Sequence, residues 1–152
     1  MIVREIIPDD AVKLIELGKQ FHKESPFHSR YKFDVNKSVN FMKSLALSSD
    51  CCFYVATDKN NKILGIVGGQ MLSLYYTEDK YASELIFYVS PESRGGRTAL
   101  SLLRKFESWA KDNGAKDVEL GVVTGINAKK ADSFFKKAGY NYLGANFYRE
   151  IL

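Results

Sequence analysis

Hydrophobic residues recur along the chain with two different periods, which predict helices interleaved with strands. Near the amino terminus, apolar positions spaced three and four apart predict helices over about residues 10–24 and 34–47. The inward faces of these helices are expected to carry Ala11, Leu14, Ile15, Gly18 and Phe21, and then Val35, Val39, Met42 and Leu45 or Ala46. A third amphipathic stretch follows Pro91 and ends before Asn113, and a shorter fourth one covers residues 128–138.

Between these stretches, β-branched and aromatic runs predict strands. They cover residues 1–7, 51–57, 62–76, 82–90 and 117–123, and a final antiparallel pair at 140–144 and 146–152. The turn residues 58–61 join two of the runs into a hairpin. This order of elements predicts an α/β (α+β) fold, with one sheet and helices on its faces, in a single domain over residues 1–152.

The composition is that of one domain outside the membrane. A chain of 152 residues with 45% hydrophobic and 13% aromatic residues can fill one core. Cys51 and Cys52 are neighbours, for which reduced, buried thiols are expected, and the amino terminus lacks the apolar run of a signal peptide. We therefore expect a cytoplasmic protein. The net charge of +4 suits an anionic small molecule as well as nucleic acid and does not choose between them.

The segment PESRGGRTALSLL, residues 91–103, contains the clearest candidate binding site. A strand ends at its proline and a helix then begins, so the first N–H groups of the helix lack carbonyl partners and, with the helix dipole, can hold an anion. Gly95 and Gly96 let a phosphate approach the backbone, and Arg94 and Arg97 add positive charge. The glycine spacing matches neither the P-loop nor the dinucleotide fingerprint. A diphosphate fits these features, and a tight turn with solvated arginines is the alternative that stays open.

The sequence around this segment resembles the GNAT superfamily of N-acetyltransferases over nearly its whole length. In that family a strand ending in Val-x-Pro leads into Arg/Gln-x-x-Gly-x-Gly/Ala, and VSPESRGGRTA is similar, with Arg97 where the middle glycine is usual. The resemblance implies a twisted mixed sheet of about six or seven strands, splayed where acetyl-CoA binds. It also implies that acetyl-CoA, as co-substrate, is bound by Tyr88, Val89, Arg94, Gly95, Gly96, Arg97, Thr98 and Ala99.

A second segment, NAKKADSFFKKAGYNYLG, resembles the family's Asn-x-x-Ala-x-x-x-Tyr-x-x-x-Gly-Phe segment, which packs on the cofactor. Asn127 lies one position further upstream than usual, and Phe135 takes the place of the tyrosine that often protonates the departing thiolate. Both residues are expected beside acetyl-CoA. Tyr140, Tyr142 and Tyr148 are the remaining candidates for a general acid, and Tyr140 is the one that matches the family register. A thiolate whose conjugate acid has a pKa of roughly 8.5 can also leave with little protonation.

Glu84, on the strand 82–90, is the candidate general base. Alternation along this strand predicts that Glu84, Ile86 and Tyr88 share one face. A carboxylate among apolar strand residues is expected to have a raised pKa, which suits removal of a proton from an ammonium group. Some GNAT members use a strand glutamate in this position. The alternative is an edge carboxylate that is paired with a lysine.

The reaction that the resemblance implies is direct transfer of an acetyl group to a primary amine of a small molecule or protein. The loop 21–34 resembles in location the acceptor-binding segment of the family, but its mixed charges leave the acceptor open. His22 and His28 lack a further ligand nearby, so no metal site is expected. The alternative function is a non-catalytic module of the same fold that binds nucleic acid or a protein partner. For the enzyme we expect neither a membrane nor nucleic acid as partner, and a homodimer stays open.

Overall fold

The computed structural model describes residues 1–151, apart from the side chains of Leu45 and Ala46, so the inward orientation predicted for those two lies outside the described residues. The strands are β1 (Ile2–Glu5), β2 (Cys51–Thr57), β3 (Ile63–Ser73), β4 (Lys80–Val89) and β5 (Ala115–Glu119). The helices are α1 (Ala11–Glu24), α2 (Val35–Ala46), α3 (Thr98–Asp112) and α4 (Ala128–Lys137). The strands form one sheet in the order β1-β2-β3-β4-β5, in which the first four are antiparallel and β5 is parallel to β4.

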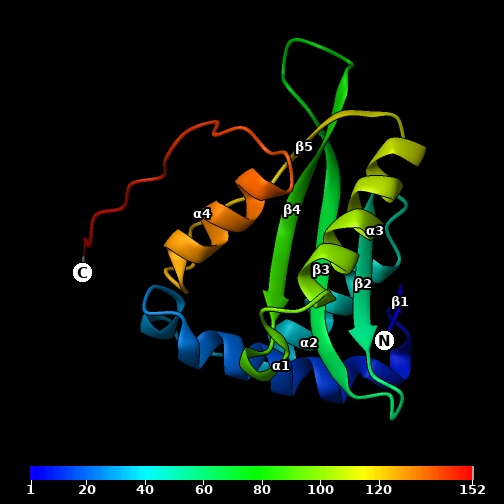
Figure 1. The fold of residues 1–152 in the computed structure, drawn as a ribbon, viewed down its shortest axis with the longest axis vertical. Coiled ribbons are helices and arrows are strands. Elements are labelled where there is room, and N and C mark those ends of the chain that lie inside the picture. Colours follow the sequence, from blue (N-terminus) through cyan, green and yellow to red (C-terminus); the bar gives the residue numbers. More distant parts are fainter. Residues whose placement is uncertain (152) are drawn as a thin grey trace.

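Helices cover both faces of this sheet (Figure 1). The amphipathic stripe of α3 packs on one face, where Leu102 and Phe106 are fully buried against β2, β3 and β4. On the opposite face, Leu14 and Leu17 of α1 pack against the alternate side chains of the same strands, and α2 lies next to α1. The predicted α/β architecture is confirmed. Among the described helices, none combines the length and apolar character that crossing a membrane requires.

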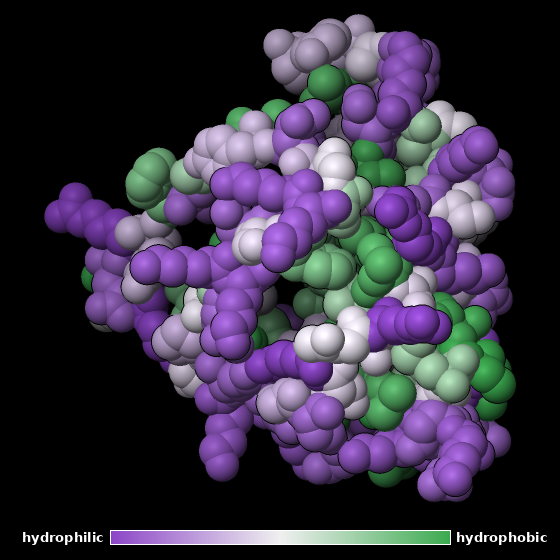
Figure 2. All heavy atoms as spheres, viewed as in Figure 1, coloured by the Kyte–Doolittle hydropathy of each residue, from purple (hydrophilic) through white to green (hydrophobic). Residues whose placement is uncertain are grey.

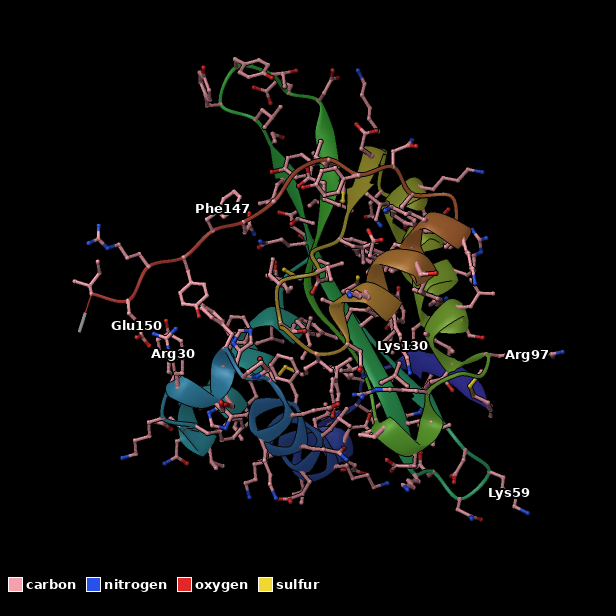
Figure 3. All side chains as sticks on the ribbon, turned by 60° about the vertical axis from the view of Figure 1, so that its left-hand side comes forward. Arg30, Lys59, Arg97, Lys130, Phe147 and Glu150 are labelled. Atoms are coloured by element: carbon pink, nitrogen blue, oxygen red, sulfur yellow. The ribbon has the colours of Figure 1, made fainter. Side chains whose placement is uncertain are left out.

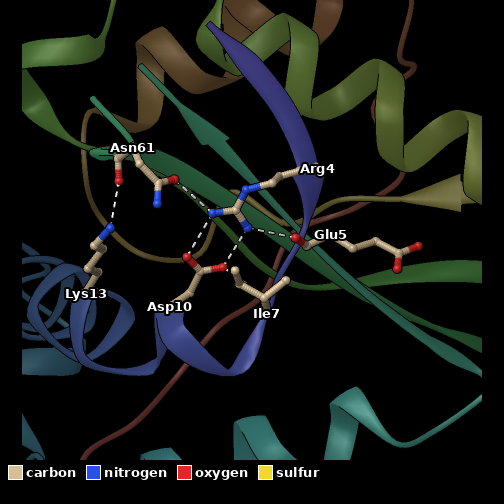
Figure 4. A network of polar contacts seen from close by, with 6 residues as sticks. All are labelled: Arg4, Glu5, Ile7, Asp10, Lys13 and Asn61. Carbon is tan, nitrogen blue, oxygen red and sulfur yellow. Dashed lines mark hydrogen bonds and ion pairs between the residues drawn. The ribbon is translucent and has the colours of Figure 1, made fainter. Parts of the chain in front are cut away.

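A buried carboxylate fixes the turn from β1 into α1 (Figure 4). Asp10, only 1% exposed, accepts hydrogen bonds from Nη1 and Nη2 of Arg4 at 2.7 and 2.9 Å, and from the backbone N–H of Ile7 at 2.9 Å. The guanidinium of Arg4 holds the pKa of Asp10 below its usual range. Because both carboxylate oxygens of Asp10 accept hydrogen bonds from charged or backbone donors, the Arg4–Asp10 pair sets the direction in which α1 leaves β1.

The strand pair predicted at the carboxyl end is wrong for the residues that the structure describes. Residues 141–151 run as an extended chain without a strand partner, and all their side chains are exposed (Figure 1). This chain reaches the α1–α2 connection, where Arg30 and Glu150 form an ion pair of 2.8 Å (Figure 3). Adjacent aromatic residues such as Phe147 and Tyr148 would point to opposite faces of a strand, so neither face offers a continuous apolar row. The sheet consequently has five strands rather than six or seven.

A bulge in β4 changes the faces on which its side chains lie. The register with β3 shifts between Glu84 and Ile86, which leaves Leu85 as an extra residue on β4. Leu85, Ile86 and Tyr88 therefore all pack on the α1 side. Glu84 lies opposite Gly69 in β3, so the side chains at these two positions share a face. A Cβ added at Gly69 would come within 2.4 Å of the Phe106 ring of α3, which places Glu84 on the α3 side. The prediction that Glu84 shares a face with Ile86 and Tyr88 is wrong, because simple alternation fails across a bulge.

Candidate active site

The edge of β4 next to β5 is paired over only part of its length. β5 lies beside residues 80–83 of β4 and ends before the predicted strand 117–123 does. The chain then leaves the sheet, and the N–H of Gly121 binds the side chain of Glu84 instead of a carbonyl of β4. Residues 84–89 of β4 thus have no strand beside them on this edge. The splay that the resemblance implies between neighbouring strands is present here.

The N–H group of Val89 points into this gap. The amide of the next residue, Ser90, donates to the carbonyl of Leu64 in β3 at 2.9 Å, on the other side of the strand. Because successive residues of a strand direct their N–H groups to opposite sides, the N–H of Val89 faces away from β3. Figure 2 shows a hollow in the middle of the molecular face, where Figure 1 places α4 opposite the carboxyl end of β4.

The loop between β4 and α3 leaves a row of backbone N–H groups free. Gly95 has a φ of +78°, a conformation that favours glycine. Within the part of the chain that the structure describes, no protein group accepts a hydrogen bond from the amides of residues 95–100. A Cβ on Gly95 or Gly96 would meet no atom within 4 Å, so the loop is open to solvent on that side. An open row of amides at the start of α3, a helix of 15 residues, is suited to bind an anion.

The two arginines of this loop lie in different surroundings. Arg97 is exposed and extends into solvent (Figure 3). Arg94 instead turns back toward α1, where its Nη2 donates to Oε2 of Glu24 at 2.7 Å and its Nη1 donates to Oε1 of the same carboxylate. Its Nε donates to the carbonyl of Val89 at 2.9 Å. The charge of Arg94 is balanced within the protein, and contact of either arginine with a diphosphate stays a prediction.

Glu24, the last residue of α1, joins this helix to both β4 and the loop. Its Oε2 accepts a hydrogen bond from the hydroxyl of Tyr88 at 2.8 Å, and the Arg94 guanidinium lies 5.3 Å from the centroid of the Tyr88 ring. Its hydrogen bonds with Arg94 hold the pKa of Glu24 below its usual range, whereas burial and the neighbouring carboxylate raise the pKa of Tyr88. Nothing in the local sequence indicates the pairing of Glu24 with Arg94, because these residues are 70 positions apart.

Glu84 lies where β4 and β5 separate. Its Oε2 accepts a hydrogen bond from the N–H of Gly121 at 3.0 Å. Burial raises the pKa of the Glu84 carboxyl, and this hydrogen bond opposes the effect. No lysine or arginine forms an ion pair with it in the described part of the chain, so the alternative of a lysine-paired edge carboxylate is not what the structure contains. A carboxylate with a raised pKa beside an open strand edge is suited to accept a proton.

The residues of the second motif lie in different surroundings. Phe135 is buried on α4, with its ring centroid 5.8 Å from that of Phe87 in β4, and Asn127 is exposed just before α4. The hydroxyl of Tyr140 donates to Oε1 of Glu107 on α3 at 2.9 Å. Burial, together with this carboxylate, raises the pKa of Tyr140. A hydroxyl that is bound in this way is a weak proton donor, so the acid role of Tyr140 stays a prediction that its surroundings do not favour.

The histidines of the α1–α2 connection have structural partners. Nε2 of His22 lies 2.6 Å from the carbonyl oxygen of Tyr31. The ring of His28 packs near Phe21 and Phe27, with centroid distances of 5.0 and 5.3 Å. No group of three metal-ligating side chains comes together in the described residues. Both histidines are therefore held by contacts within α1 and the connection.

The first motif and most of the second lie within one match to a known family. The model of the acetyltransferase (GNAT) family matches residues 15–140, which include the open loop and most of the second motif. The chain belongs to the GNAT acetyltransferase family. A search of curated proteins finds no match.

Solved structures show that the GNAT fold extends over nearly the whole chain. A mutant of the BH1408 protein from Bacillus halodurans has a TM-score of 0.82 and 17% identity, with 100% of both chains covered. A GNAT family acetyltransferase from Staphylococcus aureus has a TM-score of 0.69 and 20% identity, covering 99% of this chain and 98% of that one. An aminoglycoside acetyltransferase from an uncultured soil metagenomic sample, in complex with trehalose, has a TM-score of 0.76 and 18% identity, covering 99% and 96%. These identities support a shared fold alone.

Proposed function

We propose that this GNAT domain transfers an acetyl group from acetyl-CoA directly to a primary amine. The observation that carries the proposal is the open row of amides at residues 95–100, which lies at the end of the unpaired edge of β4. That edge carries Glu84 at one end and the free N–H of Val89 at the other. A diphosphate site, a polarising donor and a carboxylate base are the parts that acetyl transfer from a CoA thioester needs.

In this mechanism the amine nitrogen attacks the thioester carbonyl carbon, and the carbon–sulfur bond breaks. Glu84 accepts the proton that the amine nitrogen loses, which its raised pKa favours near neutral pH. The N–H of Val89 donates to the carbonyl oxygen as negative charge develops there. The amides of residues 95–100 hold the diphosphate, together with Arg97 on the same loop.

No covalent enzyme intermediate is part of the proposal. Burial raises the pKa of the Cys52 thiol to about 12, so Cys52 stays protonated and is a poor nucleophile. The CoA thiolate departs without a dedicated acid, since its conjugate acid, with a pKa of roughly 8.5, is acidic enough for the unprotonated thiolate to leave. Tyr140 is left out of this step because its hydroxyl is bound to Glu107.

The test is Glu84→Gln, assayed by release of free CoA with a panel of primary amines between pH 6 and 9. Gln keeps an oxygen that can accept the hydrogen bond from Gly121 but cannot take up the proton. Turnover should fall by about 10²–10⁴-fold, the typical contribution of a general base, while CoA affinity stays nearly unchanged. Glu119→Gln, at the exposed end of β5, is the matched control and should retain full turnover. Unchanged turnover and an unchanged pH profile in Glu84→Gln would remove Glu84 from the mechanism.

The alternative of a non-catalytic module makes a different prediction for binding. Salt-sensitive association with random DNA, in a protein that does not bind CoA, would favour that alternative over acetyl transfer.

A further inference from the structure

A cavity of about 560 Å³ lies between α1, α2 and the face of the sheet opposite α3. Its walls are formed mainly by aliphatic and aromatic side chains, among them Leu14, Leu17, Phe21, Met42, Phe53 and Ile66. An apolar cavity of about 150 Å³ is already enough to bind a benzene-sized molecule, and ligand pockets commonly have volumes of about 300–1,000 Å³. The cavity therefore has the size of a ligand site rather than of a packing defect.

The walls of the cavity carry almost no charge. Among the described residues that line it, Lys43 of α2 is the one ionisable side chain with a free charge, and no carboxylate is present. The hydroxyl of Tyr88 is bound to Glu24, and that of Ser38 is bound to the carbonyl of Asp34 at 2.7 Å. An ammonium group would find no partner inside and would be repelled by the lysine. The part of a ligand that fits inside is an uncharged hydrocarbon chain or ring.

The bulge of β4 brings this cavity next to the proposed reaction groups. Leu85 and Ile86 both line it, although consecutive residues of a regular strand would point to opposite faces. Glu84 directly precedes them, and its carboxylate lies on the other face of the sheet, at the edge of β4 where it accepts the N–H of Gly121. Tyr88, another lining residue, directly precedes Val89. A ligand whose apolar part fills the cavity can therefore present its polar end to Glu84 around the edge of β4 that β5 leaves unpaired.

We propose that this cavity holds the apolar body of the acceptor, a primary amine that carries an alkyl or aryl chain of several carbons. The inference rests on the proposed acetyl transfer and names the acceptor class for it. The anion site at the start of α3 belongs to the opposite face of the sheet, which leaves the α1 face to the second substrate. Ile7, Phe41 and Leu47 line the cavity and are exposed, so a longer chain can leave through an apolar mouth at this end.

The test is the rate of acetylation of n-alkylamines from ethylamine to octylamine at fixed acetyl-CoA. Burial of each methylene should raise kcat/KM about fourfold, so octylamine should exceed butylamine by about two orders of magnitude. Met42→Trp, which fills the cavity from α2, should abolish this length dependence. Asn40→Trp, on the exposed side of the same helix, is the matched control and should keep the length dependence. If Met42→Trp does not fold, Ala11→Leu fills the cavity from α1 instead.

A thermal melt without acetyl-CoA separates this inference from the proposed transfer. Octylamine should raise the melting temperature of the wild type and not that of Met42→Trp, whereas ethylamine should raise neither. If octylamine stabilises the wild type in this way but no amine is acetylated, the cavity assignment stands and the transfer is wrong. If amines of all lengths are acetylated equally, in wild type and Met42→Trp alike, the inference is overturned while the transfer stands. A preference for octanoyl-CoA over acetyl-CoA that Met42→Trp reverses would assign the cavity to the acyl chain and overturn the inference as well.

Discussion

Glu24→Gln is expected to destabilise the domain and to loosen the proposed diphosphate loop. In the wild type the Glu24 carboxylate binds Arg94 through both oxygens and also accepts the hydroxyl of Tyr88. Gln offers one acceptor oxygen and no charge, so Arg94 loses its counter-ion while remaining partly buried. Since Arg94 also holds the carbonyl of Val89, the loop and the end of β4 should both become less ordered.

The size of the effect follows from the exposure of the pair. Hydrogen bonds to charged groups contribute about 1.5–3 kcal/mol when they are shielded, and exposed ion pairs about 0.2–1 kcal/mol. The side chains of Arg94 and Glu24 are 28% and 27% exposed, between these limits. We therefore expect the free energy of unfolding to fall by about 1–2 kcal/mol, or about 2–8 °C in melting temperature for a domain of this size.

The pH dependence of this loss is fixed by the pKa of Glu24, which its hydrogen bonds with Arg94 hold below the usual range. A carboxyl with a lowered folded-state pKa stabilises fully above its unfolded pKa, about 4.3, and the stabilisation is lost as pH falls through the folded value. Urea titrations at pH 7 and pH 3 should thus show a wild-type advantage at pH 7 that shrinks at pH 3. Glu16→Gln, in an exposed pair with Lys19, is the control and should cost less than about 0.5 kcal/mol. Equal stability of Glu24→Gln and wild type at pH 7 would refute the reasoning.

Three further outcomes are expected. Gly95→Ala should lower the free energy of unfolding by about 1–2 kcal/mol and weaken CoA binding in calorimetry, because the φ of Gly95 is +78°. Gly96→Ala, at an open position without that constraint, should have a mild effect. Equal effects of the two substitutions would contradict this account of the loop. Arg97→Glu should weaken CoA binding about tenfold at low salt and less at high salt. The control Lys59→Glu, on the distant β2–β3 hairpin (Figure 3), should leave CoA binding unchanged. A loss that does not depend on salt, or an equal loss in Lys59→Glu, would count against an electrostatic role of Arg97. Burial raises the pKa of the Cys52 thiol to about 12, so Cys52 should resist iodoacetamide at pH 8 until the protein unfolds. Rapid modification of Cys52 in the folded protein, located by peptide mapping, would show that the thiol is accessible.

Features that depend on local sequence could be predicted. The amphipathic stripe of α3 and the glycine pair before it lie within one short segment, so helix periodicity and the missing backbone partners at a helix start are readable without the fold. Glu84 could be named for the same reason, since an acidic residue inside an apolar strand is unusual on its own. Its raised pKa is the direct consequence of that placement.

Features that depend on distant contacts could not be predicted. The bulge at Leu85 follows from the register between β3 and β4, and alternation within β4 alone gives the wrong face for Glu84. The ion pair of Glu24 with Arg94 joins residues 70 positions apart, so the arginine looked free to bind an anion. At the carboxyl end, strand-like composition was present, but residues 141–151 pair with none of the described strands.

The central claim, that the loop before α3 binds the diphosphate of CoA through its backbone, is tested most directly by an NMR titration of the ¹⁵N-labelled protein with CoA. The claim predicts saturable shifts that are largest at the amides of residues 95–100, from which no group of the described residues accepts a hydrogen bond. If CoA at up to millimolar concentration shifts none of these amide signals, or shifts only the signals of amides elsewhere, the claim is contradicted.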